Sequence, residues 1–163
     1  MNLRQTFYSK EIIEKSLELS NILKLSDEEL PMLAATFGLS GSVQDQLAAL
    51  LDRFSLRLVA YTRGADGSLL VAPDETHEHP GCPVEVVDSV GAGDSFTATL
   101  CMGLLKGKPL SQINDRANQV AAFVCSQAGA TPVLQERILD EVIKDGKASR
   151  PEKTATERRE MAK

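Results

Sequence analysis

Residues 86–96 read VVDSVGAGDSF, and this is the stretch of the sequence that most strongly indicates the fold and the chemistry of the chain. The apolar residues that lead into this stretch predict a β-strand over residues 83–87, and a helix is expected over about residues 94–106. Between the two lie Gly91 and Gly93, which allow the backbone to approach a ligand closely. Because the start of a helix carries unpaired N–H groups and about half a positive charge, phosphate is the ligand that this arrangement favours.

Asp94 stands at the predicted start of that helix, where the helix dipole favours its ionised form. A carboxylate there repels a phosphate group that is bound at the start of the helix but is not reacting. It can, however, accept a proton from a hydroxyl that attacks a phosphorus atom held by Gly91, Ala92 and Gly93. Phosphoryl transfer needs positioning, stabilisation of spread negative charge and one base to orient the nucleophile. The loop and the aspartate together predict a phosphotransferase site.

Three other interpretations of the loop were weighed. A dinucleotide-binding fingerprint needs a third glycine where Phe96 stands. A Walker loop needs Gly-Lys-Ser or Gly-Lys-Thr, which occurs nowhere in the sequence. A purely structural role, with Asp94 as a helix cap and the glycines as a tight turn, is left open by the spacing alone.

The rest of the chain alternates between helix-like and strand-like patterns. Helices are expected over residues 9–20, 26–38, 42–54, 111–128 and 138–143, and strands over 22–25, 57–62 and 68–72. This alternation predicts an α/β fold with a mostly parallel sheet and helices on both faces, with one antiparallel hairpin at the turn over residues 63–67. His77 and His79 fall in an expected loop, where exposure to solvent is favoured over a shared metal ion.

The composition limits the classes of protein that this chain can represent. With 163 residues, 42% hydrophobic and 25% charged, it is expected to fold as one globular domain, and no apolar run reaches the roughly 18 residues of a membrane span. Residues 144–163 hold seven Lys or Arg and four Asp or Glu, a charge of +3, which leaves −8 for residues 1–143. An acidic body argues against nucleic acid as a ligand. Three widely spaced cysteines are typical of a reducing cytoplasm.

The segment over residues 88–94, DSVGAGD, resembles the Asp-Thr-x-Gly-Ala-Gly-Asp signature of the ribokinase/PfkB family of sugar and nucleoside kinases, with Ser89 in place of Thr. Residues 62–67, TRGADG, resemble the Thr-Leu-Gly-x-x-Gly nucleotide loop of the same family, with Arg63 in place of Leu. Three more segments follow in the family's order: Asn2-Leu3-Arg4, Ala117-Asn118 and Gly129-Ala130-Thr131-Pro132.

The resemblance implies a role for each residue of this loop system. Asp94 would be the base that deprotonates a sugar hydroxyl, and Gly91, Ala92 and Gly93 would form the anion hole for the γ-phosphoryl group of ATP. The residues implied to contact ATP are Thr62, Gly64, Gly67 and Asn118.

The resemblance also implies binding sites for a magnesium ion and for a monovalent cation. Residues 26–29 match the family's Asn-x-x-Glu motif with Ser26 in place of Asn, and Glu29 would organise magnesium and its phosphate-bound water. Ser-x-x-Glu is equally a helix capping box, and the two interpretations can coexist. A monovalent cation, potassium, would be held by Asp88, Val90, Val124 and Gly129. Val133 stands where ribokinases often have a side-chain hydroxyl ligand.

The resemblance covers roughly residues 1–143, which are expected to be the C-terminal, nucleotide-binding and catalytic part of a ribokinase-like kinase, without the sugar-binding half and lid. Residues 144–163 are expected to form a charged, disordered tail.

The implied activity is transfer of the γ-phosphoryl of ATP, with Mg²⁺, to a sugar hydroxyl. A fructose-like hexose is favoured from residues 2–4 and 26–30, with ribose or a nucleoside such as adenosine as alternatives. A non-catalytic remnant that binds nucleotide or a partner is the second hypothesis. Without the sugar-binding half, apolar surface that this half would cover is expected to be exposed, and such a surface would favour association with a partner or a homodimer.

Overall fold

The computed structural model describes residues 8–134. The chain divides into two units, Met1–Val133 and Leu134–Lys163, and every helix and strand described below belongs to the first. Asn2-Leu3-Arg4, the expected helix over residues 138–143 and the expected tail over residues 144–163 lie outside the described residues.

Local sequence signals place the first three helices. Helix α1 (Lys10–Glu18) begins where the Ser9 side chain accepts a hydrogen bond from the Ile12 N–H (3.3 Å). Helix α2 (Leu30–Phe37) ends at Gly38, which adopts a left-handed conformation with φ of 68°. Helix α3 (Val43–Arg53) begins at Ser42 with a capping box. The expected starts of α1 and α3 and the expected end of α2 are confirmed.

Replacing Ser42 with Ala is expected to lower the free energy of unfolding by about 1 kcal/mol, because the hydroxyl that caps the start of α3 is lost. The Ser42 hydroxyl accepts the Asp45 N–H (3.2 Å), and the Asp45 carboxylate accepts the Ser42 N–H (2.8 Å). Urea unfolding followed by circular dichroism measures the change. Ser40→Ala, at an exposed serine just upstream, is the matched control, and an equal effect of both variants would contradict the capping role.

The described sheet has four strands in the order β1 (Ile22–Ser26), β2 (Leu58–Thr62), β3 (Ser68–Val71) and β4 (Thr76–His79). Strand β1 pairs with β2 in parallel, whereas β2–β3 and β3–β4 are antiparallel. The α/β class is confirmed, but this sheet is mixed rather than mostly parallel. The short connections after β2 and β3 can only return the chain antiparallel, and only the crossover through α2 and α3 is long enough for a parallel pair.

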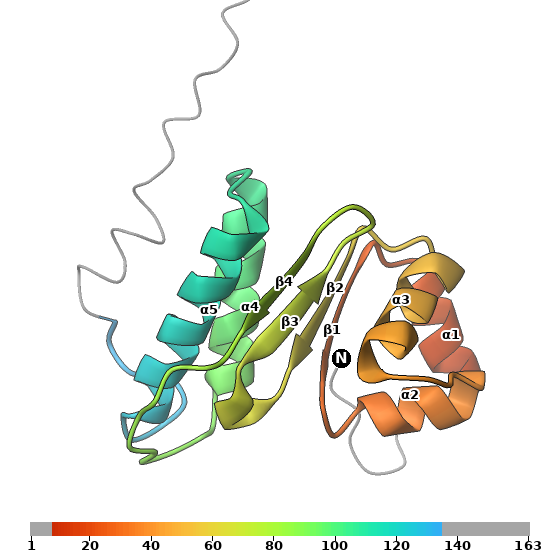
Figure 1. Cartoon of the computed structure of the whole chain (residues 1–163). Helices are drawn as coiled ribbons and strands as arrows, with labels where there is room; N and C mark the ends of the chain where they lie inside the picture. Colours follow the sequence, from red (N-terminus) through yellow and green to blue (C-terminus); the bar gives the residue numbers. More distant parts are fainter. Residues whose placement is uncertain (1–7, 135–163) are drawn as a thin grey trace, which may run out of the picture. The chain divides into compact units, whose positions relative to one another are not determined.

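Helices cover both faces of this sheet, as expected (Figure 1). Successive residues of β2 point to opposite faces. Val59 and Tyr61 pack in the core cluster that contains the buried side chains of α1, α2 and α3. Leu58 and Ala60 pack in a second cluster with buried residues of α4 (Ala92–Leu105) and α5 (Leu110–Cys125). This second layer is the one that carries the glycine-rich loop.

Three expected segments differ from the structure. The helix expected over residues 26–38 begins only at Leu30, because Ser26 ends β1 and residues 27–29 form a turn. Residues 83–87 form no strand: Val86 and Val87 are each 61% exposed, and the Val87 N–H donates to the Cys125 carbonyl (2.8 Å) rather than to a neighbouring strand. The expected loop at His77 and His79 is instead strand β4, paired with β3. Polar residues dominate β4, so its pairing comes from the backbone and from contacts with α5, which local periodicity does not reveal.

The two histidines of β4 have separate partners on α5. The His77 carbonyl accepts a hydrogen bond from Asn114 Nδ2 (3.0 Å), and His79 Nε2 lies 3.2 Å from Asp115 Oδ1. Within residues 8–134, no group of three or more His, Cys, Asp or Glu side chains could hold a metal ion. None of the helices described there is long and apolar enough to span a membrane.

Candidate active site

The glycine-rich loop lies where α4 begins. Gly91 is the N-cap residue of α4 and has a φ of 85°, in the left-handed region that favours glycine. In the described part of the chain, the Ala92 N–H donates to the Ser89 carbonyl (3.3 Å), whereas the N–H groups of Gly91 and Gly93 donate to no backbone acceptor. Two of the three predicted anion-hole amides therefore remain available, which fits an anionic ligand.

A second loop packs directly against Gly91. A Cβ atom at this position would lie 2.3 Å from the Ala130 carbonyl oxygen, so only glycine permits the approach. Residues 91–93 and residues 129–132, which are far apart in the sequence, are thus brought together. Both were singled out from the sequence.

Asp88 fixes the geometry between these two loops. One of its carboxylate oxygens accepts the Val90 N–H (2.9 Å), and the other accepts the Gly129 N–H (3.2 Å). Its own N–H donates to the Cys125 carbonyl at the end of α5 (3.1 Å). Burial raises the pKa of the Cys125 thiol, and the negative charge of Asp88 raises it further.

The predicted potassium ligands are brought together only in part. Asp88, Val90 and Gly129 are joined by the hydrogen bonds above. Val124 is buried, and its carbonyl accepts the Gln127 N–H (3.1 Å) as part of the end of α5. Val133 is 92% exposed. Both carboxylate oxygens of Asp88 accept backbone N–H groups, and the set of cation ligands stays a prediction.

Asp94 lies in the first turn of α4 with its side chain exposed. Among the described residues its carboxylate forms no hydrogen bond or ion pair. A carboxylate in this position is accessible to a ligand that approaches the start of the helix, as a proton acceptor must be.

The predicted nucleotide loop over residues 62–67 is a tight turn. The Arg63 N–H donates to the Gly67 carbonyl (2.8 Å) around a single turn of 3₁₀ helix, Gly64–Asp66. A Cβ atom on Gly67 would lie 2.0 Å from the His79 carbonyl oxygen, so the loop packs closely against the end of β4. Arg63, which departs from the family pattern, forms an ion pair with Glu78 (2.8 Å) and thereby braces the loop against β4.

The turn over residues 26–29 adjoins this loop. Glu29 is buried, and its carboxylate accepts the Ser26 N–H (2.9 Å). Helix α2 begins only at Leu30 and has no side-chain cap, so the capping box expected at Ser26 is wrong. The Asp27 N–H donates to the Thr62 carbonyl (2.9 Å), and the Thr62 hydroxyl donates to the Leu25 carbonyl (3.3 Å). The magnesium role of Glu29 stays a prediction.

Asn118 belongs to a buried polar network that the sequence did not reveal. Its Nδ2 donates to Ser68 Oγ (2.7 Å) and to the Asn114 carbonyl (2.8 Å), and Ser68 Oγ donates to Asn114 Oδ1 (2.5 Å). The amide nitrogen of Asn118 therefore has internal partners, and its contact with ATP stays a prediction. The one available signal was the pair of asparagines four residues apart on the apolar face of α5.

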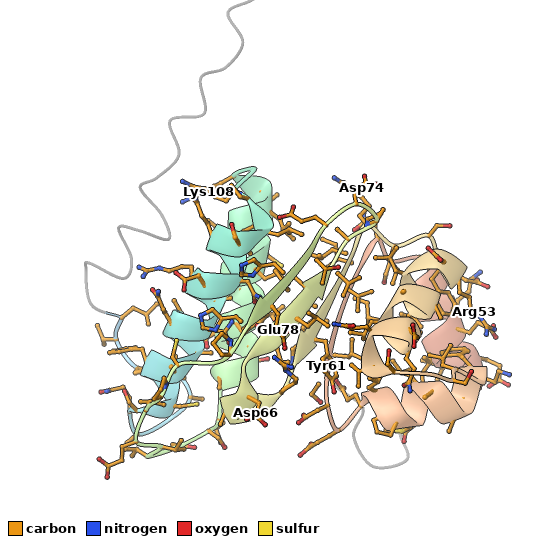
Figure 2. The ribbon with its side chains drawn as sticks, in the orientation of Figure 1. Arg53, Tyr61, Asp66, Asp74, Glu78 and Lys108 are labelled. Carbon is orange, nitrogen blue, oxygen red and sulfur yellow. The ribbon has the colours of Figure 1, made fainter. Side chains whose placement is uncertain are left out.

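These elements meet at one end of the sheet. The parallel strands β1 and β2 end at Ser26 and Thr62, and ligands of open α/β sheets bind outside the carboxyl ends of the strands. Figure 2 marks both ends of the sheet, with Asp66 in the nucleotide loop and Asp74 in the opposite β3–β4 turn.

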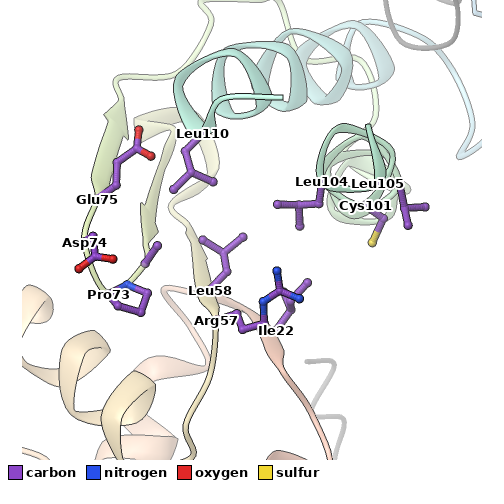
Figure 3. Close-up of a pocket in the computed structure, with 11 residues that line it drawn as sticks. Ile22, Arg57, Leu58, Pro73, Asp74, Glu75, Cys101, Leu104, Leu105 and Leu110 are labelled. Atoms are coloured by element: carbon purple, nitrogen blue, oxygen red, sulfur yellow. The ribbon is translucent and has the colours of Figure 1, made fainter. Parts of the chain in front are cut away.

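A cavity of about 600 Å³ lies at that opposite end. Figure 3 shows Ile22 and Arg57, at the start of β1 and just before β2, across from Cys101 and Leu104 of α4. This cavity is therefore separate from the predicted phosphate site.

Comparison with known proteins shows which proteins this chain is similar to. A fructokinase of Escherichia coli is 28% identical over 146 residues, which cover 82% of this chain and 46% of that protein. A fructokinase of Salmonella typhimurium is 32% identical over 120 residues, covering 73% of this chain and 38% of that protein. The chain thus spans less than half the length of these two relatives.

Solved structures show the same fold. An aminoimidazole riboside kinase of Salmonella enterica, in complex with aminoimidazole riboside and an ATP analogue, matches with a TM-score of 0.69 and 28% identity, over 87% of this chain and 50% of that one. A ribokinase of Thermotoga maritima matches with a TM-score of 0.69 and 22% identity, over 86% and 46%. The ribokinase-like fold is confirmed. Because the family model described as pfkB family carbohydrate kinase matches residues 1–137, the chain belongs to the pfkB family of carbohydrate kinases.

Proposed function

We propose that this chain is the nucleotide-binding and catalytic part of an ATP-dependent sugar kinase. The observation that carries the proposal is the start of α4, where the N–H groups of Gly91 and Gly93 are available beside the exposed carboxylate of Asp94. Residues 1–143 form the functional unit in this proposal, and residues 144–163 are an appended charged segment.

In the proposed reaction, the oxygen of an acceptor hydroxyl forms a bond to the γ-phosphorus of ATP, and the bond from that phosphorus to the β–γ bridging oxygen breaks. ADP leaves with the electron pair of that bond, and the hydroxyl proton passes to the Asp94 carboxylate. The available amides of Gly91 and Gly93 stabilise the negative charge on the transferred group, and the Ala92 amide would join them on giving up its bond to the Ser89 carbonyl.

ATP would lie along the edge formed by the nucleotide loop, with Thr62, Gly64 and Gly67 near its phosphates and Asn118 nearer its base. Mg²⁺, when bound, would neutralise phosphate charge, and Glu29 at the same edge would organise it and its phosphate-bound water. A monovalent cation such as K⁺ is proposed next to the anion hole, where Asp88 would supply its carboxylate and Val90, Val124 and Gly129 their carbonyl oxygens.

A fructose-like hexose is the proposed acceptor, supported by the fructokinases among the relatives. Ribose and nucleosides are the alternatives to compare, since an ATP-dependent ribose-1-phosphate kinase of Halopiger xanaduensis is also 28% identical over 116 residues. The free thiols of Cys82, Cys101 and Cys125 support a cytoplasmic location.

Association with another polypeptide or a second copy is proposed through the outer side of α4. Leu105 there is 83% exposed, and Cys101 and Met102 are exposed as well. Helix α4 is apolar on most of its sides, and a helix of this kind is usually buried against other protein elements on most sides.

The proposal is tested with the 163-residue chain. Isothermal titration calorimetry with Mg²⁺–ATP is expected to show saturable binding, and ADP release is then measured with fructose, ribose and adenosine, with acceptor-free samples as controls. The largest rate is expected with fructose. Absence of ATP binding would refute the proposal, and binding of ATP without transfer to any acceptor would favour the non-catalytic alternative.

A further inference from the structure

Lys24 is a charged residue that no motif singled out. Its neighbours Leu23 and Leu25 on β1 are buried in the core cluster of α1, α2 and α3. Since strand residues alternate between faces, Lys24 lies on the opposite face, that of α4 and α5. Its register partner on β2, Ala60, packs in the cluster of α4 and α5 and confirms this orientation.

The side chain of Lys24 reaches the predicted anion hole. A Cβ atom built on Gly93 would lie 3.5 Å from Lys24 Nζ, and within residues 8–134 no other atom outside the helix backbone and the adjacent residues would lie within 4 Å of it. The ammonium group therefore lies directly beside the first turn of α4. The missing side chain of Gly93 leaves the space between them open.

The negative charges around this turn would repel a bound phosphate, and the ammonium group of Lys24 can offset them. The exposed carboxylate of Asp94 lies in the same turn, and that of Asp88 lies just before it, so a bound polyphosphate meets two negative charges. Backbone amides offer only partial positive charges. A lysine supplies a full charge that phosphate oxygens bind through short, charge-assisted hydrogen bonds.

We propose that Lys24 binds the terminal phosphates of ATP across Gly93 and thereby offsets the repulsion from Asp94. This inference rests on the proposed function, because it assumes that a nucleotide occupies the start of α4. It adds a phosphate-binding residue from β1 to a site otherwise built from the loop before α4, the loop after α5 and the nucleotide loop.

The test measures the binding of ATP, ADP and AMP to the unmodified full chain and to the variants Lys24→Met and Lys24→Arg. Lys10→Met, at an exposed position of α1, is the control. Lys24→Met is expected to weaken ATP binding about 10- to 100-fold, as for a lost charged hydrogen bond, and to leave AMP binding within about twofold. Lys24→Arg is expected to retain most of the affinity and Lys10→Met all of it.

The outcomes separate this inference from the proposed function. If the unmodified chain binds no ATP, both fail. If it binds ATP and Lys24→Met binds it equally well, the role of Lys24 alone is refuted.

A second measurement needs no variant. Acetylation of lysines in the unmodified chain by a succinimidyl ester, followed by mass spectrometry, is expected to be slowed at Lys24 by Mg²⁺–ATP and unchanged at Lys10. Equal acetylation of Lys24 with and without bound ATP would overturn the inference, even if Lys24→Met failed to fold.

Discussion

Asparagine in place of Asp94 is expected to lower sugar-dependent ADP release by about 10²- to 10⁴-fold, the contribution typical of a positioned general base. The side chain keeps its size and its place in the first turn of α4 but cannot accept the proton of the attacking hydroxyl. ATP affinity is expected to stay the same or to increase, because a negative charge next to the phosphates is removed. A loss of turnover without a loss of ATP binding distinguishes a catalytic base from a residue that merely caps the helix.

The experiment requires both readouts on the same preparations. ADP release is measured with the best acceptor, and ATP binding is measured by calorimetry. Asp52→Asn, at an exposed position in α3, is the matched control for the change of charge. Unchanged turnover in Asp94→Asn would refute the assignment of the base. Weakened ATP binding would indicate instead that Asp94 organises the loop.

Replacing Gly91 with Ala is expected to lower the free energy of unfolding by about 2–4 kcal/mol and to weaken ATP binding. The residue has a φ of 85°, which costs a residue with a Cβ atom about 1–2 kcal/mol. The added atom would also lie 2.3 Å from the Ala130 carbonyl oxygen, so the loop over residues 129–132 must move away.

Gly93→Ala is the matched control for the change in stability. Gly93 is inside α4 without a positive φ, and its added methyl group would make an ordinary contact with Lys24 Nζ at 3.5 Å. Alanine there is expected to stabilise the helix by up to about 1 kcal/mol. It is also expected to weaken ATP binding, because the methyl group fills the space beside the ammonium. Urea unfolding with an unchanged m-value measures both variants, and equal stabilities would show that the contact of Gly91 with Ala130 is not tight.

Much of the fold could be predicted because its signals are local. The serines at positions 9 and 42, the glycine at position 38 and the apolar stripes of α1, α3 and α5 specify helices through contacts within a few residues. The glycine-rich loop was likewise recognisable, since its glycines and Asp94 occupy fixed positions relative to the start of one helix. The strand expected over residues 83–87 failed because its apolar residues have no partner strand in the described sheet.

The candidate site was foreseen as a set of separate segments, and its assembly was not. Residues 91–93 and 129–132 each carry a recognisable pattern, but their contact depends on how α4 and α5 pack. The placement of Lys24 beside Gly93 depends on the parallel pairing of β1 with β2 and on the packing of α4 over that face. The same holds for the buried network of Ser68, Asn114 and Asn118, which joins β3 to α5.

The sequence by itself therefore determined the starts of α1 and α3, the end of α2, the glycine-rich loop with its aspartate and the family to which the chain is similar, because each depends on residues close together in the chain. Only the tertiary structure decided that β4 joins the sheet, that Gly91 must lie against Ala130 and that Lys24 reaches the start of α4. These features depend on side chains and backbone atoms more than 35 positions apart, or on pairing between strands, and no local pattern specifies such distances.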